Sequence, residues 1–191
     1  MDKGDSESAG DAFAEMDQLR EKIAKLEKRV KMLDALAHQD VLVSVPNRRG
    51  FMRELEALIA RVSRYGEDAA MLFVDIDGLK RINDSFGHKA GDEALIQVAN
   101  LLTGGVRKSD CVARLGGDEF GVLLSHATEE SARETAGRLT AAIEQQDTHC
   151  DGNRLPLSVA IGVTVIAAND TPDAVIARAD RSMYDEKSAA A

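Results

Sequence analysis

Two pairs of carboxylates in this sequence have the residue types and spacing of a site that binds metal ions. Asp75 and Asp77 end the apolar run AAMLFVDID, and Asp118 and Glu119 stand within RLGGDEFGVLL, directly after two glycines. Clustered carboxylates repel one another unless a cation lies between them. Because oxygen ligands without His or Cys favour hard ions, the two pairs together indicate Mg²⁺ or Mn²⁺.

Carboxylates that hold such ions at a sheet edge suit phosphoryl or nucleotidyl transfer, in which metal ions activate a hydroxyl and neutralise phosphate charge. The polar residues after the first acidic pair fit a nucleotide, and they are Lys80, Asn83, Asp84, His88 and Asp92. An Asn and an Asp together can bind guanine. The amide bonds to O6 or N3, and the carboxylate accepts from N1–H and the 2-amino group.

The two glycines, Gly116 and Gly117, separate two apolar runs, which predicts a β-hairpin of residues 111–115 and 119–124. Glycine reaches the positive φ that tight turns require. Residues 69–77 are expected to form a buried strand, and the acidic pairs meet at one sheet edge if this strand neighbours the hairpin. For the glycine stretch alone, a turn followed by solvated acids is the alternative.

The remaining elements are predicted from apolar periodicity and capping residues. Pro46-Asn47 starts a helix, further helices are expected over 78–86, 91–102, 128–144 and 171–187, and LPLSVAIGVTVIAA contains a strand. Thr171 is the expected N-cap of the last helix. This order predicts an α+β domain over residues 39–191, with a mixed sheet and surrounding helices packed mainly against one face.

Residues 15–38, here called the stalk, carry apolar residues spaced alternately three and four apart: Met16, Leu19, Ile23, Leu26, Val30, Leu33 and Ala37. β-Branched residues at a with Leu at d favour a parallel two-stranded coiled coil. In such a dimer the g-to-e pairs Glu15–Arg20, Lys22–Glu27 and Arg29–Asp34 all have opposite charges. The alternative is a single amphipathic helix that lies on its own domain.

The bulk composition excludes several partners. The 191 residues carry a net charge of −9, which argues against nucleic acid, since phosphate backbones are bound by basic surfaces. Cys111 and Cys150 match neither a metal site nor a disulfide framework. No apolar run spans a bilayer and the acidic start is not a signal peptide, so we expect a cytoplasmic protein without membrane insertion. Residues 1–14 are polar and small and are predicted to be disordered.

Five ordered blocks of the sequence resemble the GGDEF family of diguanylate cyclases. They are DVLVSVPNRR from Asp40, DIDGLKRINDSFGHKAGDEAL from Asp75, RKSDCVARLGGDEF from Arg107, LSVAIGV from Leu157 and ADRSMYDEK from Ala179. The resemblance covers residues 38–187 and implies a ferredoxin-like fold similar to the palm of adenylyl cyclases and polymerases. It also implies that two GTP condense to cyclic di-GMP and two pyrophosphates, in a homodimer whose active sites face one another.

The resemblance assigns roles to the acidic residues and their neighbours. Asp75 and Asp118 would bind two Mg²⁺ or Mn²⁺ ions per active site, with help from the Ile76 carbonyl. Asp118 or Glu119 would act as base for the attacking 3′-hydroxyl. Lys80 would stabilise charge at the phosphates.

The same resemblance assigns the substrate contacts. Asn83, His88 and Asp92 would hold the guanine and ribose end of GTP, and Lys187 would contact its terminal phosphates. Gly116 and Gly117 would let the backbone approach GTP closely.

A second site is indicated by Arg107 and Asp110, which form an RxxD motif five residues before the glycine pair. In the family this motif is an inhibitory site, in which the Arg binds product guanine or phosphate and the Asp orients it. By itself RxxD is common, and its alternative is a solvated helix end.

The chain departs from the family pattern at Ser44, which replaces a Gly, at Leu79, which replaces a Phe, and at Ala191, where an Arg is expected. A catalytically degenerate receptor for cyclic di-GMP is therefore the main alternative function, and a coiled-coil scaffold is another. A mixed cyclic dinucleotide product is disfavoured, because Asp92 suits guanine. The input signal is not encoded in any recognisable sensor, so a regulatory protein that binds the stalk is expected.

Overall fold

The computed structural model describes residues 4–190, and the side chains of residues 16–34 and 36–188. The chain divides into two compact units, one that ends at Ala37 and one that begins at His38. We describe each unit by itself.

The first unit consists of helix α1, which runs from Gly4 to His38, so that its last residue is the first of the second unit. It begins earlier than the Glu15 start that the heptads predicted, and it includes residues 4–14, for which disorder was expected. Residues 1–3 of that segment, like the side chain of Glu15, lie outside the described residues. Extending an existing helix by one residue is easier than nucleating one, which explains the longer element.

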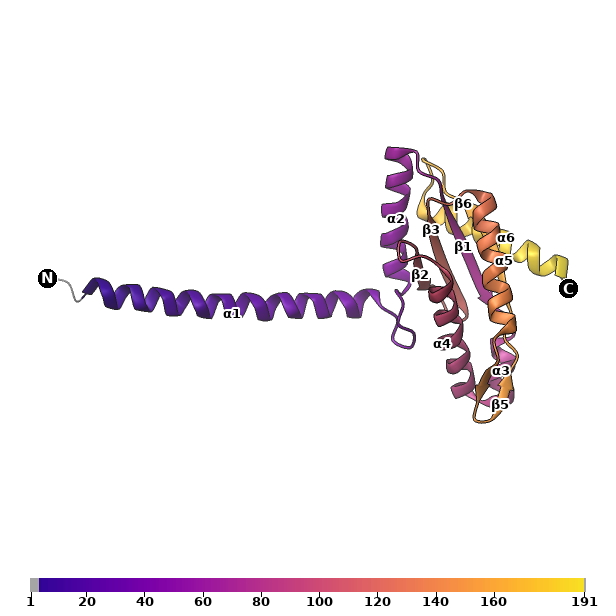
Figure 1. Cartoon of the computed structure of the whole chain (residues 1–191), viewed down its shortest axis with the longest axis horizontal. Helices are drawn as coiled ribbons and strands as arrows, with labels where there is room; N and C mark the ends of the chain where they lie inside the picture. Colours follow the sequence, from indigo (N-terminus) through magenta and orange to yellow (C-terminus); the bar gives the residue numbers. More distant parts are fainter. Residues whose placement is uncertain (1–3, 191) are drawn as a thin grey trace. The chain divides into compact units, whose positions relative to one another are not determined.

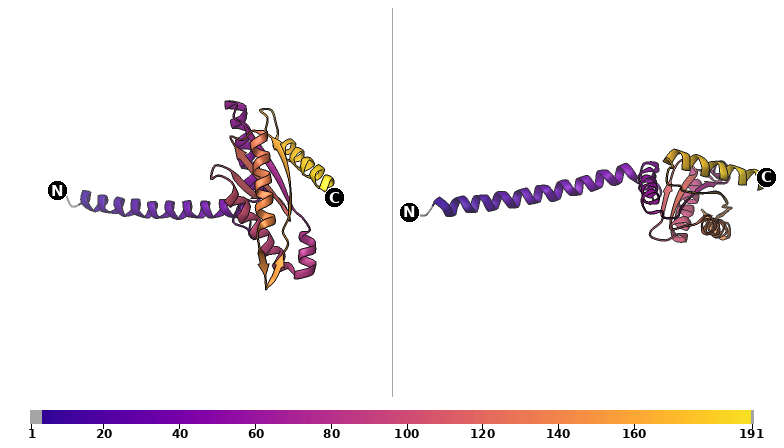
Figure 2. Two further views of the ribbon diagram at one scale, coloured as in Figure 1. Left: turned by 45° about the vertical axis from the view of Figure 1, so that its right-hand side comes forward. Right: turned by 90° about the horizontal axis from the view of Figure 1, so that it is seen from above.

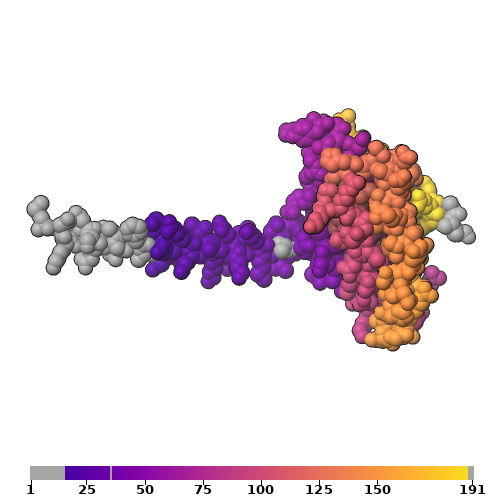
Figure 3. All heavy atoms as spheres, viewed as in Figure 1, coloured from indigo at the N-terminus to yellow at the C-terminus, as the bar shows by residue number. Residues whose placement is uncertain are grey.

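From Met16 to Leu33, the apolar heptad positions of α1 are exposed to solvent. The exposed fraction rises from 40% at Met16 to 63% at Val30, and Leu26 and Leu33 lie within this range. Figure 3 shows residues 16–34 in space-filling form. Within residues 4–190, no helix has both the length and the apolar character that a membrane span requires.

The second unit is built on a four-stranded sheet in the order β2-β3-β1-β6. Its strands are β1 (Ala69–Ile76), β2 (Cys111–Arg114), β3 (Glu119–Ser125) and β6 (Val159–Val165). The predicted α+β class is confirmed, but every pairing is antiparallel rather than mixed. The helical connection from β1 to β2 makes these strands parallel, yet β3 lies between them, so all direct neighbours run in opposite directions.

Five helices complete this unit: α2 (Arg48–Tyr65), α3 (Leu79–Phe86), α4 (His88–Gly105), α5 (Glu129–Gln145) and α6 (Pro172–Ala190). Asn47 caps α2, since its side chain accepts from the backbone N–H groups of Arg49 and Gly50. The predicted cap of α6 is present, because Thr171 Oγ1 accepts from Ala174 N at 3.3 Å.

The helices cover both faces of the sheet, not mainly one (Figure 1; Figure 2). Strand side chains alternate between faces, so each face buries its own cluster. Leu72 and Val74 of β1 pack in one cluster with residues of α4 and α5. Met71 and Phe73 pack in the other with residues of α2 and α6. The prediction of one covered face was wrong because the central strand is apolar at nearly every position.

A small hairpin of β4 (Thr148–Cys150) and β5 (Asn153–Leu155) was not predicted. Asp151 and Gly152 form its turn with φ values of 49° and 83°. Three-residue strands are too short to show an alternating pattern, so the sequence carried no signal for them.

Candidate active site

The two acidic pairs lie side by side at one edge of the sheet. Strand β3 neighbours β1, and Asp75 is the cross-strand partner of Glu119. The backbone N–H of Ile76 donates to the carbonyl of Asp118 at 3.1 Å, so the peptide of Ile76 lies beside the second pair. The prediction that both pairs meet at one edge is confirmed.

Gly116 and Gly117 lie in the turn between β2 and β3, as predicted, but neither has the positive φ that was expected there. Among the described glycines, positive φ occurs at 66, 78, 87 and 152, and not at 116 or 117. A Cβ at Gly116 would instead collide with the carboxylate of Glu119, whose Oε2 would be 2.5 Å away. Glycine at 116 therefore leaves room for the Glu119 side chain, and Gly117 is open to its surroundings.

Lys187 of α6 reaches the acidic edge from the far end of the sequence. Its Nζ lies 2.5 Å from Asp75 Oδ1 and 3.3 Å from Asp77 Oδ1. Asp77 is held in turn by Ser158, whose hydroxyl donates to Asp77 Oδ2 at 3.0 Å. Asp77 and Lys187 also line a cavity of about 670 Å³ that extends to Arg81. A cation thus already lies between two carboxylates at this edge.

Electrostatics at this edge are unfavourable for the charged carboxylates. Burial raises the pKa of Asp75, and the charges of Asp118 and Asp77 raise it further against the opposing effect of Lys187. The pKa of Glu119 is also raised, first by burial and then by Asp118 and Asp75. Burial lowers the pKa of Lys187, but its bonds to the two aspartates outweigh this, and the net shift is upward.

These residues fit a hard divalent cation. All the side-chain ligand atoms are oxygens, and neighbouring carboxylates contribute to the raised pKa values of Asp75 and Glu119, an effect that a cation between them would reverse. In the described part of the chain, no three acidic, His or Cys side chains already stand close enough to hold an ion together. The ammonium of Lys187 occupies part of the space beside Asp75, so ion binding requires these side chains to move.

The predicted nucleotide contacts lie on the two helices after β1. Lys80 and Asn83 are on α3, and His88 and Asp92 are on α4. Asn83 packs against Gly91 in the first turn of α4, where a Cβ would overlap the amide oxygen of Asn83. Among the described residues, no hydrogen bond joins these four side chains to the acidic edge.

The RxxD motif forms a tight loop between α4 and β2. Asp110 Oδ2 accepts from Arg107 N at 3.0 Å, and Asp110 N donates to the carbonyl of Arg107 at 3.0 Å. Asp110 Oδ1 accepts from Ser125 N on β3 at 3.1 Å. The loop is therefore fixed to the sheet, while the guanidinium of Arg107 is exposed.

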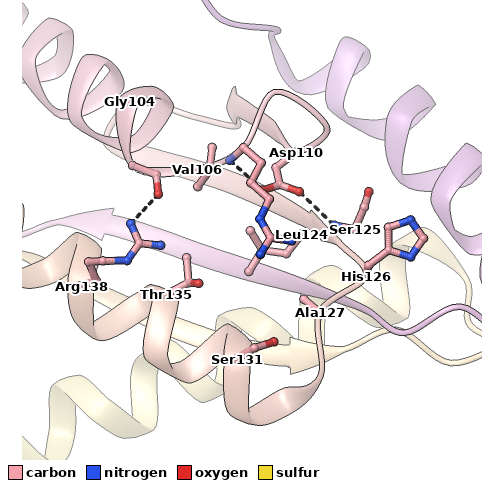
Figure 4. A pocket seen from close by; sticks show the side chains of 12 residues that line it. Gly104, Val106, Asp110, Leu124, Ser125, His126, Ala127, Ser131, Thr135 and Arg138 are labelled. Carbon is pink, nitrogen blue, oxygen red and sulfur yellow. Dashed lines mark hydrogen bonds between the residues drawn. The ribbon is translucent and has the colours of Figure 1, made fainter.

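This loop borders a cavity of about 350 Å³ that α5 closes from the other side. Figure 4 shows Ser131, Thr135 and Arg138 along α5 and Asp110 with Ser125 opposite. Arg138 Nη1 donates to the carbonyl of Gly105 at 2.7 Å, so it lies at the rim. Sequence reasoning missed Arg138, because an Arg on the polar face of an amphipathic helix is ordinary.

An antiparallel sheet, helices on both faces and two acidic pairs at one edge define the class of this protein, an α+β domain of the palm type. A family model described as "Diguanylate cyclase, GGDEF domain" matches residues 37–191. The chain belongs to this GGDEF family, as the five sequence blocks indicated.

Individual relatives agree with this assignment. The diguanylate cyclase TpbB of Pseudomonas aeruginosa (strain UCBPP-PA14) is 38% identical over 181 residues, which are 94% of this chain and 42% of TpbB. The chain thus spans less than half of that relative's length. The solved GGDEF domain of TpbB from strain PAO1 is 40% identical, with a TM-score of 0.74 over 78% of this chain and 88% of that one.

A third protein matches nearly the whole chain. It is the diguanylate cyclase SiaD of Pseudomonas aeruginosa, solved in complex with its activator SiaC. SiaD is 25% identical, with a TM-score of 0.77 over 97% of this chain and 74% of that one.

Proposed function

We propose that this chain is a diguanylate cyclase, which condenses two GTP into cyclic di-GMP and releases two pyrophosphates. One observation carries the proposal, the cross-strand pairing of Asp75 with Glu119. This pairing sets both acidic pairs beside the turn that contains Gly116 and Gly117, here called the glycine turn. Membership of the GGDEF family supports the same activity.

The reaction consists of two equivalent transfers. In each, the 3′-oxygen of one GTP forms a bond to the α-phosphorus of the other, and the bond from that phosphorus to the β-phosphate oxygen breaks. Pyrophosphate leaves, and Glu119 or Asp118 accepts the proton of the 3′-hydroxyl. The raised pKa of Glu119 supports the role of base, since a base works best when its pKa approaches the working pH.

Asp75 and Asp118, with the carbonyl of Ile76, are the residues that would hold two Mg²⁺ or Mn²⁺ ions per active site. Bound ions would supply charge neutralisation at the phosphates and a lower pKa for the attacking hydroxyl. Lys187, which already lies at this edge, would contact the terminal phosphates, and Lys80 would stabilise the charge that develops there.

The guanine and ribose would lie against α3 and α4. Asn83 and Asp92 have the amide and carboxylate that together complement guanine. Asn83 lies against Gly91, the residue before Asp92, and this supports the proposed use. His88, at the start of α4, would contact the same end of the nucleotide.

Each domain would hold one GTP, so turnover requires two domains to face each other in a twofold dimer. A parallel coiled coil of two α1 helices would bring them together. The exposed apolar residues of α1 support this, because an apolar stripe of that length is normally covered by a partner helix. The opposite charges at Lys22–Glu27 and Arg29–Asp34 favour the parallel orientation.

A regulatory protein is proposed to bind the stalk. SiaD, which matches 97% of this chain, was solved in complex with an activator. This supports the idea that a partner protein controls the present chain. A change in coiled-coil register would re-aim the two domains and so change the rate.

Cyclic di-GMP is proposed to bind in the cavity beside the RxxD loop and inhibit the enzyme. Arg107 and Arg138 border the cavity from opposite sides, and both can form paired hydrogen bonds with a phosphate or with guanine. Asp110 would orient the Arg107 loop rather than contact the ligand alone, since both of its oxygens already accept backbone bonds.

The test is incubation of the chain with GTP and Mg²⁺, followed by chromatography with mass detection, beside Asp118→Ala. We expect cyclic di-GMP from the unmodified chain and none from the variant. No product from either, together with tight binding of added cyclic di-GMP, would favour the receptor alternative. No product and no binding would contradict both functions.

A further inference from the structure

His38, the last residue of α1, and the nine residues 39–47 that separate it from α2 form a closed structure, here called the junction turn. Gln39 and Pro46 are joined by an antiparallel bridge. Inside it, Asp40 N donates to the carbonyl of Val45 at 3.0 Å, and Asn47 N donates to the carbonyl of His38 at 2.9 Å. The chain that leaves α1 therefore enters a turn whose shape its own backbone bonds determine.

Asp40 organises the inside of the junction turn. Its Oδ1 accepts from the backbone N–H groups of Leu42 and Val43 at 2.9 and 3.0 Å. The same oxygen lies 3.4 Å from Arg114 Nη1, and the side chains of Asp40 and Arg114 are only 17% and 16% exposed. The ion pair is thus largely shielded from solvent, where such pairs are stronger than at the surface.

Arg114, the last residue of β2, joins the junction turn to the glycine turn. Its Nε donates to the carbonyl of Gly116 at 3.0 Å, and its Nη2 donates to the carbonyl of Gly117 at 2.7 Å. Its backbone N–H donates to the carbonyl of Pro46 at 2.9 Å. One planar guanidinium therefore contacts both glycine carbonyls and the carboxylate of Asp40.

Besides Arg114, backbone bonds hold the flanks of the glycine turn: Leu115 N donates to the carbonyl of Glu119 at 2.8 Å, and Ile76 N donates to the carbonyl of Asp118 at 3.1 Å. No heavy atom lies within 4 Å of the position that a Cβ would take at Gly117. The N–H of Gly116 reaches the carbonyl of Glu119 only at 3.4 Å. Arg114 is consequently the main side chain that fixes the orientation of these two peptide groups.

We infer that Arg114 is a positioning residue that couples the junction turn to the glycine turn, so that the chain at the end of α1 influences GTP binding. The inference rests on the proposed function, in which the glycine turn contacts GTP. A guanidinium holds three acceptors in one rigid plane, which a lysine ammonium cannot reproduce. The coupling gives a regulator of the stalk a physical connection to the substrate site.

The test compares Arg114→Lys and Asp40→Asn with a matched control, Arg133→Lys. Arg133 is exposed and pairs with Glu129 within α5, away from both turns. Amide hydrogen exchange is measured without nucleotide at residues 116–118 and 40–45, and KM for GTP and the affinity for cyclic di-GMP are measured alongside.

Within residues 116–118 the Gly116 amide donates to the carbonyl of Glu119, and we expect its exchange to quicken about tenfold in Arg114→Lys, the effect of losing one charge-assisted hydrogen bond that holds the turn. KM for GTP should rise by a similar factor, while the affinity for cyclic di-GMP stays within twofold. Asp40→Asn should quicken exchange at both turns, although it touches only one of them. Arg133→Lys should change nothing.

An exchange rate at residues 116–118 that is the same in Arg114→Lys as in the unmodified chain would overturn the inference. Faster exchange spread evenly over the whole domain would overturn it as well. Exchange needs no substrate, so it separates this inference from the proposed function. A chain that shows the predicted exchange but makes no cyclic di-GMP would leave the coupling in place and contradict the cyclase.

Discussion

Lys187 Nζ lies 2.5 Å from Asp75 Oδ1, although the two residues are 112 positions apart in the sequence. This ion pair brings the last helix of the domain onto the end of its central strand. It also places a protein cation where the carboxylates would otherwise attract a metal ion. Under the proposed function, Lys187 and a divalent ion would therefore compete for Asp75.

Replacement of Lys187 by Gln should tighten Mn²⁺ binding to the nucleotide-free chain several-fold, because the ammonium no longer competes for Asp75. The same change should raise KM for GTP about tenfold, since a charge-assisted contact to phosphate is lost. Mn²⁺ titration followed by electron paramagnetic resonance measures the first effect. Lys89→Gln is the control, as Lys89 pairs with Asp151 at the surface. Weaker Mn²⁺ binding in Lys187→Gln would contradict competition.

Glu119→Gln should stabilise the fold while it abolishes turnover. The pKa of Glu119 is raised above its ordinary value of 4.5, so its ionisation opposes folding. The favourable contribution of the protonated form is present below pH 4.5 and is lost as pH rises through the folded pKa. At pH 7.5 the variant should unfold about 2–6 °C higher, since substitutions at strained sites gain about 0.5–2 kcal/mol.

The pH dependence provides the check on that account. Differential scanning calorimetry should show the gain at pH 7.5 and little difference at pH 4, where Glu119 itself is largely protonated. Cyclase activity should fall by at least about a hundredfold if Glu119 is the base. A variant that is less stable at pH 7.5 than the unmodified chain would refute the electrostatic explanation.

The cavity beside the RxxD loop should lose its proposed affinity for cyclic di-GMP when either Arg107 or Arg138 is removed. Arg107→Ala and Arg138→Ala should each weaken cyclic di-GMP binding about 10- to 100-fold, the range for one or two charge-assisted hydrogen bonds. Isothermal titration calorimetry gives the dissociation constants. Lys108→Ala is the matched control, because Lys108 follows Arg107 in the same loop but does not line this cavity, and it should weaken binding only slightly. Equal losses in all three variants would indicate general electrostatic attraction instead of a site.

The stalk should control both assembly and activity. Leu26→Asp combined with Leu33→Asp puts two charges at d positions and should yield a monomer by sedimentation equilibrium. Turnover should fall at least about a hundredfold, because the two active sites then meet only by diffusion. Gln18→Asp with Ala24→Asp adds the same charge outside the a and d positions and should leave a dimer. A fully active monomer would disprove the requirement.

The ion pair between Asp170, in the loop after β6, and Arg178 of α6 should make the stability of the fold depend on pH. Arg178 lowers the pKa of Asp170, to which it donates from both Nη1 and Nη2 at 2.9 and 2.7 Å. This contribution to stability is present above pH 3.8, the ordinary pKa of Asp170, and is lost as pH falls through the lower folded pKa.

Asp170→Asn should therefore lower the unfolding temperature by about 3–6 °C at pH 7, the effect of a charge-assisted hydrogen bond that is partly exposed. The difference should shrink near pH 2.5. Thermal unfolding followed by circular dichroism at both pH values measures it, and an equal difference at both would contradict the ionic origin.

Much of this protein could be predicted from local sequence patterns. Local patterns depend only on neighbours within a few positions of the chain. They include the heptads of α1, the hairpin of β2 and β3, and the arrangement of apolar residues within each element. The acidic pairs were recognisable for the same reason, since each is a short motif at the end of a strand.

Other features depend on which strands become neighbours and which helices pack over them. The antiparallel sheet, the helices on both faces and the contact of Lys187 with Asp75 arise from the strand order β2-β3-β1-β6. The contact of Arg138 with Gly105 at the cavity beside the RxxD loop and the contact of Arg114 with Asp40 belong to the same group. Residues fifteen or more positions apart in the chain have no fixed spacing in the sequence, so only the packed tertiary structure decides their contacts. The sequence by itself therefore determined the elements and the chemistry they carry, and folding decided how that chemistry is assembled.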